Sequence, residues 1–282
     1  MKQFPRTNVA GISLPRMLIG TNWLLGWSHK SVPLDNMITR KYNTAESFLP
    51  MFEAYLTYGI NAIMGPLGNT PVILDALKMA SDKFEKEFIL IDTPIINVDD
   101  TKEGRESAAA IIKRSKEINA KLCLPHHSSV EQLVNKNKGT IERLDDYTSM
   151  IRENDLIPGL SAHMPELIVY SDANNYDVET YIQIYNCLGF LMQVEIEAIA
   201  GIINKAKKPV MVIKSMAAGR VTPYVALNFV WNTLRDKDMV TLGAYLPDEV
   251  HEDVEISFAA LERRFPDLEG RSSPNMNQAA FG

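Results

Sequence analysis

Imidazole, amine and carboxylate groups stand directly after several short apolar runs of this 282-residue chain. The four strand-end groups are Asp92, His126, His163 and Lys214. Imidazoles beside a carboxylate can transfer protons in catalysis or bind a metal ion. A lysine that ends a wholly apolar strand loses hydration, which lowers its pKa and makes it a candidate nucleophile. The sequence therefore predicts that these four residues are catalytic, with the carboxylate orienting an imidazole.

These residues also have alternative roles. Because side chains alternate along a strand, only one residue of the pair His126-His127 can point to the inside of a closed sheet. We expect this residue to be His126, on the face of Leu124, with His127 facing a helix or capping it. The alternative for Lys214 is an ion pair with Asp92.

A divalent metal is a second interpretation of the same groups. Asp92, His126 and His163 come from three successive expected strands and offer oxygen and nitrogen ligands. The sequence leaves metal-free and metal-assisted catalysis both open.

Other polar and aromatic side chains at the expected strand ends can bind a substrate or cofactor. We predict this role for Asn22, Trp23, Ser161, Gln183, Tyr185, Asn186 and Arg220. Residues 217–220 are small and cationic and lead to Thr222-Pro223 at a helix start, where backbone N–H groups can bind an anion. The alternative is that Gly219 only relaxes the turn and Thr222 only caps the helix.

A unit that repeats eight times along the chain gives these residues a common location. Each unit has an apolar run of strand length, a small or polar residue, and an amphipathic stretch of helix length. The expected strands are 17–21, 60–64, 88–92, 121–125, 157–161, 181–185, 209–214 and 239–243. The expected helices are 45–58, 71–86, 103–118, 141–153, 165–171, 194–205, 223–234 and 248–263. Alternating buried strands and helices predict an α/β fold, a single (β/α)₈ TIM barrel with its site at the carboxyl ends of the strands.

The remaining segments are interpreted as parts of one domain that spans residues 1–282. Residues 1–16 predict a short N-terminal β-hairpin, and residues 270–282 form a polar C-terminal tail. Residues 24–43 are the longest irregular segment, and a loop of this length in a compact domain is typical of a lid over a site.

Composition excludes several classes of partner. The formal net charge is −6 and no basic stripe is present, so we expect no nucleic acid partner. No segment approaches the ~18 apolar residues of a membrane span, and no signal-peptide core follows Lys2 and Arg6. We therefore expect a cytoplasmic protein that acts on a small molecule, with its oligomeric state left open. Cys123 and Cys187 predict buried thiols and no disulfide framework.

Several segments resemble the aldo-keto reductase superfamily in their order and spacing. They are VAGIS at 9–13 with Gly20-Thr21, GINAI at 59–63, GLSAH at 159–163 with Pro165-Glu166-Leu167, QIYN at 183–186, KSMAAGR at 214–220, and 240–254. The resemblance covers most of the chain and implies the same barrel. In that family an Asp, Tyr, Lys and His act with a nicotinamide cofactor that delivers hydride, and the tyrosine hydroxyl donates the proton.

This chain departs from that catalytic set at most positions. Met64 stands where the family's aspartate is expected, Asn69 where its tyrosine is expected, and Asp92-Thr93 in the region of its lysine. Only His126 matches, at the end of the fourth strand. Because a carboxamide is not an effective proton donor, the resemblance implies a related fold that does not perform ordinary carbonyl reduction.

The cofactor site differs as well. The family holds the adenosine phosphates with small and basic residues around the last strand and helix, whereas residues 247–253 make that helix start acidic here. Acidic groups oppose a 2′-phosphate, which disfavours NADPH. Ser161, Gln183 and Asn186 can still hold a nicotinamide amide, so NAD(P)H and a divalent metal both stay as alternatives for the cofactor.

We interpret the protein as a small-molecule enzyme on an aldo-keto reductase-like barrel, with acid–base or metal-assisted chemistry on a small polar, carbonyl- or sugar-like substrate. Its class is open between lyase or isomerase chemistry and oxidation–reduction. The four catalytic candidates should converge on one pocket walled by Trp23 and Tyr185. One alternative is an NAD(P)H-dependent reductase that takes its proton donor from Tyr185 or the 24–43 loop, and another is a non-catalytic barrel that binds a ligand or partner.

Overall fold

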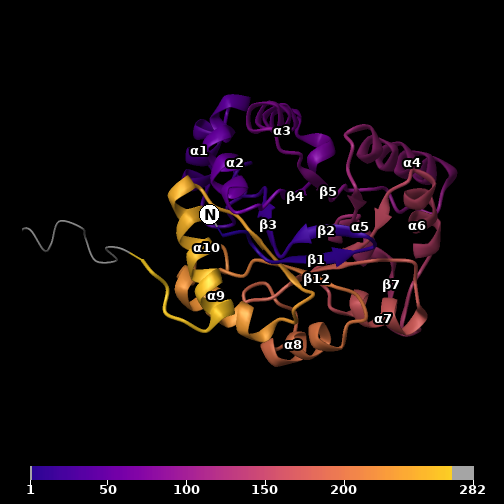
Figure 1. Ribbon diagram of the computed structural model, residues 1–282. Coiled ribbons are helices and arrows are strands. Elements are labelled where there is room, and N and C mark those ends of the chain that lie inside the picture. The colour runs from indigo at the N-terminus through magenta and orange to yellow at the C-terminus, as the bar shows by residue number, and fades with distance from the viewer. Residues whose placement is uncertain (1, 269–282) are drawn as a thin grey trace, which may run out of the picture.

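A parallel sheet of nine strands forms the centre of the molecule and closes almost completely into a barrel. The structure is a computed structural model, and it describes residues 2–268. Neighbouring strands follow the order β10-β11-β12-β13-β3-β4-β5-β6-β9, and helices surround them (Figure 1). The barrel strands are β3 Met17–Gly20, β4 Ala62–Gly65, β5 Ile89–Asp92, β6 Leu122–Cys123, β9 Ile157–Pro158, β10 Leu160–Ala162, β11 Tyr181–Ile184, β12 Val210–Ile213 and β13 Met239–Leu242.

The remaining elements are helices, short 3-10 turns and two antiparallel strand pairs. The α-helices are α1 Val32–Lys41, α2 Leu49–Thr57, α3 Pro71–Phe84, α4 Lys102–Glu117, α5 His127–Val130, α6 Leu144–Glu153, α7 Glu166–Asn174, α8 Ile196–Lys205, α9 Pro223–Thr233 and α10 Pro247–Glu262. The 3-10 turns are η1 Ala45–Phe48, η2 Leu67–Asn69 and η3 Glu131–Leu133. The antiparallel pairs are β1 Arg6–Val9 with β2 Ile12–Pro15, and β7 Val134–Asn135 with β8 Thr140–Ile141.

Gly159 explains why the ring has nine strands and not the eight expected. It separates β9, which pairs with β6, from β10, which pairs with β11, so one bent segment of chain closes the barrel. A Cβ at this position would lie 2.8 Å from Leu124 Cγ and 2.8 Å from the carbonyl oxygen of Thr180, so the bend requires glycine. Each of the eight expected strands overlaps a barrel strand, and the prediction of a single parallel barrel is confirmed.

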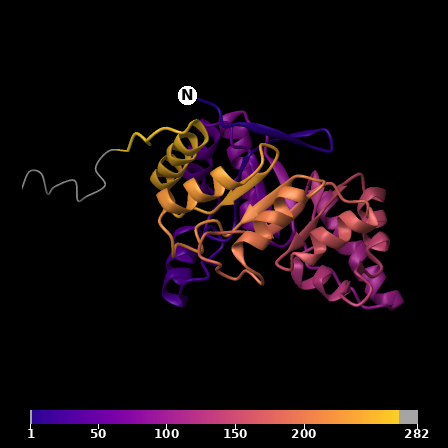
Figure 2. The same ribbon diagram turned by 90° about the horizontal axis from the view of Figure 1, so that it is seen from below.

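The predicted N-terminal hairpin is also confirmed. Strands β1 and β2 pair in antiparallel register, and the hairpin lies at one end of the barrel (Figure 2). Its residues Val9 and Leu14 pack in the same apolar cluster as Leu18 and Met239, which lie in barrel strands. The hairpin therefore covers the barrel interior at the end where these strands begin.

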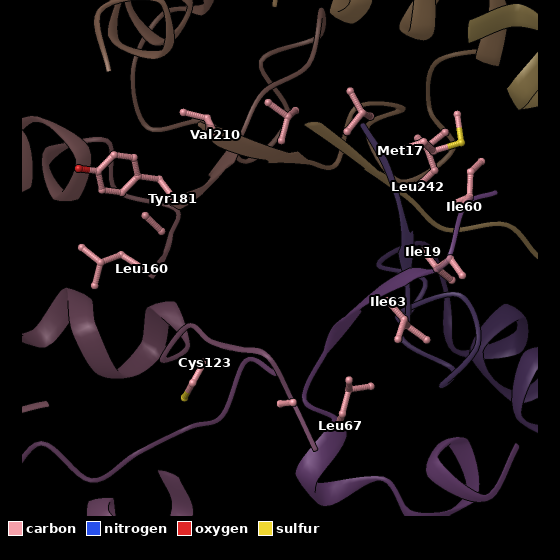
Figure 3. Packing of buried hydrophobic residues seen from close by; sticks show 14 of the residues in the cluster. Met17, Ile19, Ile60, Ile63, Leu67, Cys123, Leu160, Tyr181, Val210 and Leu242 are labelled. Carbon is pink, nitrogen blue, oxygen red and sulfur yellow. The ribbon is translucent and has the colours of Figure 1, made fainter. Parts of the chain in front are cut away.

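Side-chain alternation divides the core into an inner and an outer cluster. In β3, Leu18 belongs to the inner cluster, whereas Met17 and Ile19 pack in the cluster shared with the helices. Figure 3 shows Met17, Ile19 and Ile63 among the side chains of the outer cluster. This alternation decides which strand-end residues face the barrel axis.

Residues 24–43 contain a helix and are not irregular throughout, which corrects the sequence-based expectation. Helix α1 has ten residues, and the Ser31 hydroxyl at its N-cap accepts a hydrogen bond from the N–H of Leu34. Asp35 in the first turn and Arg40 with Lys41 in the last turn suit the helix dipole. A rigid element therefore holds the loop that follows β3.

The described part of the chain also bears on the membrane expectation. None of its helices has the length and apolar character that crossing a membrane requires. The predicted polar tail, residues 270–282, lies outside the described residues.

Gly65 offers a test of the close packing between β3 and β4. A Cβ on Gly65 would overlap the side chain of Thr21 and lie 2.9 Å from its Cβ. We expect Gly65→Ala to lower the free energy of unfolding by about 1–3 kcal/mol, measured by urea denaturation. Gly201→Ala is the matched control, because Gly201 lies in α8 with no heavy atom within 4 Å of its Cβ position. The control should be neutral or stabilising by up to about 1 kcal/mol, and an equal loss in both variants would contradict the packing argument.

Candidate active site

A cavity of about 990 Å³ opens at the carboxyl ends of the barrel strands. Trp23, which follows β3, forms part of its wall and packs closely against two glycines. A Cβ on Gly243 would lie 3.2 Å from Trp23 Cδ1, and one on Gly219 would lie 3.6 Å from Trp23 Cζ2. The absence of side chains at both positions gives the indole room to lie along the cavity.

The structure brings most of the predicted site residues to this cavity and places the others elsewhere. The predicted residues that line it are Asn22, Trp23, His126, Ser161, His163, Lys214 and Arg220. The predicted residues that do not line it are Asp92, Gln183, Tyr185 and Asn186.

Three histidine rings lie in contact in the cavity wall. The rings of His126 and His127 have centroids 4.1 Å apart, and those of His127 and His163 stack at 3.6 Å with an interplanar angle of 20°. His126 is the N-cap of the short helix α5, and its Nδ1 accepts a hydrogen bond from the N–H of Ser128 at 3.3 Å. The expected division of roles is therefore wrong for His127, since His126 caps the helix and both side chains line the cavity.

Glu131 lies behind this histidine stack and is held in place by the backbone. Its Oε1 accepts hydrogen bonds from the N–H groups of His163 at 2.6 Å and Met164 at 2.7 Å. Its Oε2 lies 3.6 Å from Nδ1 of His127. Burial alone would raise the pKa of the Glu131 carboxyl, but these donors lower it overall, so the group is a carboxylate beside the central imidazole.

The sequence interpretation missed His127 and Glu131 as members of the site. Their spacing carried a usable signal, because residues four apart lie on the same side of a helical turn. Alternation predicts an outward His127 only where the strand continues, whereas α5 begins at this residue.

Asp92 does not reach the cavity, contrary to the predicted convergence. Ile91 belongs to the inner cluster, so the next side chain points outward, between β5 and α4. Asp92 is 1% exposed; its Oδ2 accepts a hydrogen bond from Ser115 Oγ at 2.6 Å and its Oδ1 one from Gly68 N–H at 3.3 Å. Burial raises the pKa of this carboxyl. It is a buried structural group, and it neither orients a cavity imidazole nor pairs with Lys214.

Gln183, Tyr185 and Asn186 are also absent from the cavity lining. Gln183 and Tyr185 share the face of Tyr181, which packs in the outer cluster, so both point away from the barrel axis. The Tyr185 hydroxyl bonds Thr233 Oγ1 at 3.1 Å, and Gln183 Nε2 donates to the carbonyl oxygen of His163 at 3.3 Å. Asn186 accepts from and donates to the backbone of Phe190. Gln183 and Asn186 therefore brace loops and Tyr185 bonds helix α9, and none of the three walls the cavity.

The proposed metal ligands do not come together. Within residues 2–268, no group of three or more His, Cys, Asp or Glu side chains is arranged to hold a metal ion. The set of Asp92, His126 and His163 fails because Asp92 faces α4 and the two imidazoles face the cavity. This correction removes the specific metal site expected from the sequence.

Lys214 follows β12 and meets the loop after β3. Its Nζ lies 3.4 Å from Nε2 of His29, which Asn22 Nδ2 also approaches at 3.2 Å. Strand alternation would turn Lys214 outward, but its φ of 60° is left-handed and marks the end of the strand. Burial lowers the pKa of the Lys214 amine. Lys214 therefore presents an amine that is more easily neutralised than an exposed lysine.

Arg220 supplies a second cation on the same side of the cavity. Its guanidinium lies over the ring of Phe190 at 4.1 Å and donates to the carbonyl oxygens of Ala217 at 3.2 Å and His29 at 3.1 Å. Thr222 occupies the N-cap of α9, and its side chain makes no capping hydrogen bond. This side of the wall is positively charged and rich in N–H donors.

Acidic residues of α10 also line the cavity. Glu249, Glu252 and Asp253 of α10 all belong to the lining. Glu249 also accepts hydrogen bonds from the N–H groups of Tyr245 at 2.7 Å and Leu246 at 3.2 Å, which fix the start of the helix. The cavity wall therefore carries carboxylates of α10 as well as the cations that follow β12.

The outer imidazoles of the stack are neutral at physiological pH. Burial, the neighbouring His127 and the charge of Lys214 lower the pKa of His163 to about 3. Burial and His127 lower the pKa of His126 to about 4. Neutral imidazoles have one nitrogen that accepts and one that donates, so both rings can form hydrogen bonds of either kind with a substrate.

The lowered pKa of His163 predicts acid sensitivity of the fold. Between about pH 6.5 and the folded value near 3, the unfolded chain binds a proton that the folded chain does not, so stability falls as pH drops through this window. When the pH falls from about 7 to about 5, the free energy of unfolding of His163→Gln should decrease by about 1 kcal/mol less than that of the parent. This figure allows for solvent screening. Urea unfolding at both pH values measures this. His251→Gln makes the same change at an exposed position and is the control, and identical pH dependence of His163→Gln and the parent would contradict the prediction.

Comparisons with known proteins agree with the architecture. No family model matches the sequence, and no curated protein matches it either. A candidate aldo-keto reductase from Pseudomonas aeruginosa matches over 92% of this chain and 97% of its own, with 14% identity and a TM-score of 0.64. An aldo-keto reductase from Klebsiella pneumoniae in complex with NADPH matches over 96% and 98%, with 13% identity and a TM-score of 0.59. An aldose reductase from Giardia lamblia matches over 95% and 90%, with 15% identity and a TM-score of 0.53. At these identities the likeness shows the fold, and the chain has the barrel fold of the aldo-keto reductases.

Proposed function

We propose that this protein is an enzyme that performs general acid–base chemistry on a small polar molecule with a carbonyl or sugar-like group. One observation carries the proposal: the stack of His126, His127 and His163 in the cavity wall, with the Glu131 carboxylate beside its central ring. An imidazole oriented by a carboxylate and open to a cavity is the usual arrangement of a protein general base.

Each group has a role that follows from its contacts. His127 takes and returns the proton, and Glu131, with Oε2 3.6 Å from its Nδ1, orients the ring. His126 and His163 stay neutral and can donate or accept hydrogen bonds from substrate oxygens. No step requires Asp92, because its hydrogen bonds lie outside the cavity.

The cations of the wall define the substrate further. Arg220 uses two of its N–H groups on backbone carbonyls, which leaves others for an anionic group of the substrate. Lys214 places an amine in the same cavity as the histidine stack, and its charge lowers the pKa of both outer rings. Trp23 offers an apolar face beside these polar groups. The substrate class supported best is a small carbonyl compound that carries a carboxylate or several hydroxyls.

The residues of the cavity do not fit the nicotinamide chemistry suggested by the fold. No tyrosine belongs to the cavity lining within residues 2–268, and Tyr185, the proton donor considered from the sequence, bonds Thr233 on the helix side. Glu249, Glu252 and Asp253 line the cavity, where a phosphate group would meet negative charge. We therefore derive no hydride-transfer step for this chain.

Solvent exchange tests the proposed function without knowledge of the full reaction. Enzymatic removal of a proton next to a carbonyl group exchanges that position with deuterium from D₂O, and ¹H NMR detects the loss of signal. We expect exchange in at least one member of a panel of 2-oxo acids and three- to six-carbon sugars. No exchange across the panel, with saturable binding of a panel member, would favour a non-catalytic binding barrel. Tight, saturable quenching of the protein fluorescence by NADPH, together with turnover of a carbonyl substrate, would instead support a reductase.

A further inference from the structure

Lys214 is a half-buried amine that has no acidic partner among residues 2–268. The ion pairs among residues 2–268 include none in which Lys214 meets an Asp or Glu, and burial alone accounts for its lowered pKa. Its polar neighbour is Nε2 of His29, at 3.4 Å. Lysines kept for structural reasons more often pair with a carboxylate, so this amine is in an unusual setting for a purely structural group.

His29 suits the role of a neutral partner for this amine. Asn22 Nδ2 lies 3.2 Å from the same imidazole nitrogen, and both neighbours offer N–H donors to it. Burial and the nearby Lys214 charge lower the pKa of His29, which favours the neutral imidazole with Nε2 as acceptor. Arg220 donates to the backbone carbonyl of His29 at 3.1 Å and holds the loop in place. His29 is therefore a positioning residue that holds the amine without adding a negative charge.

We propose that the Lys214 amine forms an imine with the carbonyl carbon of the substrate. This inference rests on the proposed function and deepens it, since it assigns a covalent step to the same cavity. Two features of the site support it: an amine in the wall that meets His29 and no acidic side chain within residues 2–268, and the histidine stack that lines the same cavity.

The step balances with groups that are present. The neutral Nζ attacks the carbonyl carbon, a C–N bond forms, and the carbonyl oxygen becomes a hydroxyl group. This oxygen leaves as water with both hydrogens of the amine, and a proton from an imidazole or solvent converts the imine into an iminium ion. The iminium withdraws electrons from the adjacent carbon, which eases proton removal by His127, and addition of water later restores the amine and carbonyl.

Reductive trapping tests the imine directly. The protein is incubated with pyruvate or with glyceraldehyde in the presence of cyanoborohydride, and the modified lysine is located by peptide mass spectrometry. We expect saturable labelling of Lys214 by at least one of these compounds, well above labelling of the other lysines. Absence of a Lys214 adduct with both compounds, in protein that performs exchange on either of them, would overturn the inference.

Lysine variants provide matched controls for the trapping. Lys214→Met and Lys214→Arg should each abolish the dominant adduct, and thermal unfolding shows whether they are folded. Lys237→Ala is the control, because burial also lowers the pKa of this amine while its Nζ bonds the backbone oxygen of Lys207 at 2.9 Å, outside the cavity lining. It should keep the adduct on Lys214. Equal labelling of Lys237 and Lys214 in the parent protein would mean non-selective alkylation and would contradict the proposal.

Trapping and exchange together separate the two proposals. Solvent exchange without a trapped Lys214 adduct would support acid–base catalysis and contradict the imine. Trapping at Lys214 without exchange supports the imine and removes the proton transfer assigned to His127. His29→Ala adds a further readout, because loss of the neutral partner should slow trapping at fixed pH and raise the carbonyl concentration needed for half-maximal labelling.

Discussion

Replacing His127 with Gln is expected to lower the rate of solvent exchange by about 10²–10⁴-fold, the usual contribution of a positioned general base. The ring stacks on His163 at 3.6 Å, and within residues 2–268 it is the one imidazole of the stack with a carboxylate beside its Nδ1, that of Glu131 at 3.6 Å. Glutamine keeps much of the volume but cannot take up a proton at neutral pH. Initial exchange rates by ¹H NMR at saturating substrate measure the loss.

Two further variants show whether the loss arises from proton transfer. His251→Gln makes the same chemical change at an exposed site, where the ring bonds the Tyr58 hydroxyl at 2.8 Å, and it should leave the rate unchanged. Glu131→Gln keeps an acceptor for the N–H groups of His163 and Met164 but removes the charge beside His127. It should lower kcat more than it changes KM, by a smaller factor than His127→Gln. A His127→Gln protein that is folded and keeps its full exchange rate would remove His127 from the mechanism.

The alternation of side chains along the strands predicts much of the fold. It also gives the correct direction of several residues near the site. It placed His126 on the inner face with Leu124, and both line or fill the barrel interior. The same rule places Asp92 outside, because its neighbour Ile91 is inside, and it places Tyr185 on the face of Tyr181. The predictions for these two residues are wrong because a position at a strand end does not by itself place a side chain in the cavity.

Other features depend on contacts that local sequence patterns do not contain. Lys214 meets His29 across 185 positions of sequence, and its left-handed backbone reverses the outward direction that alternation predicts. His127 enters the cavity because a four-residue helix starts directly after the strand. Gly159 splits one expected strand in two because Leu124 and Thr180 pack against it. In each case a break in the regular element, which strand periodicity does not predict, sets the local course of the chain.

Replacing Arg235 with Met is expected to lower the free energy of unfolding by about 3–5 kcal/mol, the cost of leaving a buried charge without its partner. Asp238 is 0% exposed, and Arg235 donates to its Oδ2 from Nε at 2.8 Å and to its Oδ1 from Nη2 at 2.6 Å. Asp238 Oδ1 also accepts a hydrogen bond from the N–H of Val210 at 2.9 Å, at the first residue of β12. The pair therefore fixes the start of the strand that Lys214 follows.

The companion variants distinguish a buried pair from an ordinary surface contact. Arg152→Met removes an equally short pair with Asp177, 2.6 Å between Nη2 and Oδ1, and a pair with Glu179 at 2.9 Å. These carboxylates are 55% and 24% exposed, so we expect a loss of at most about 1 kcal/mol. Combining Arg235→Met with Asp238→Asn should cost less than the sum of the two single changes, because the neutral amide no longer leaves a charge in the interior. Urea denaturation of the four single or double variants measures all these differences. Since water solvates Asp177 but not Asp238, equal losses in Arg152→Met and Arg235→Met would mean that burial of the carboxylate does not govern the strength of this contact.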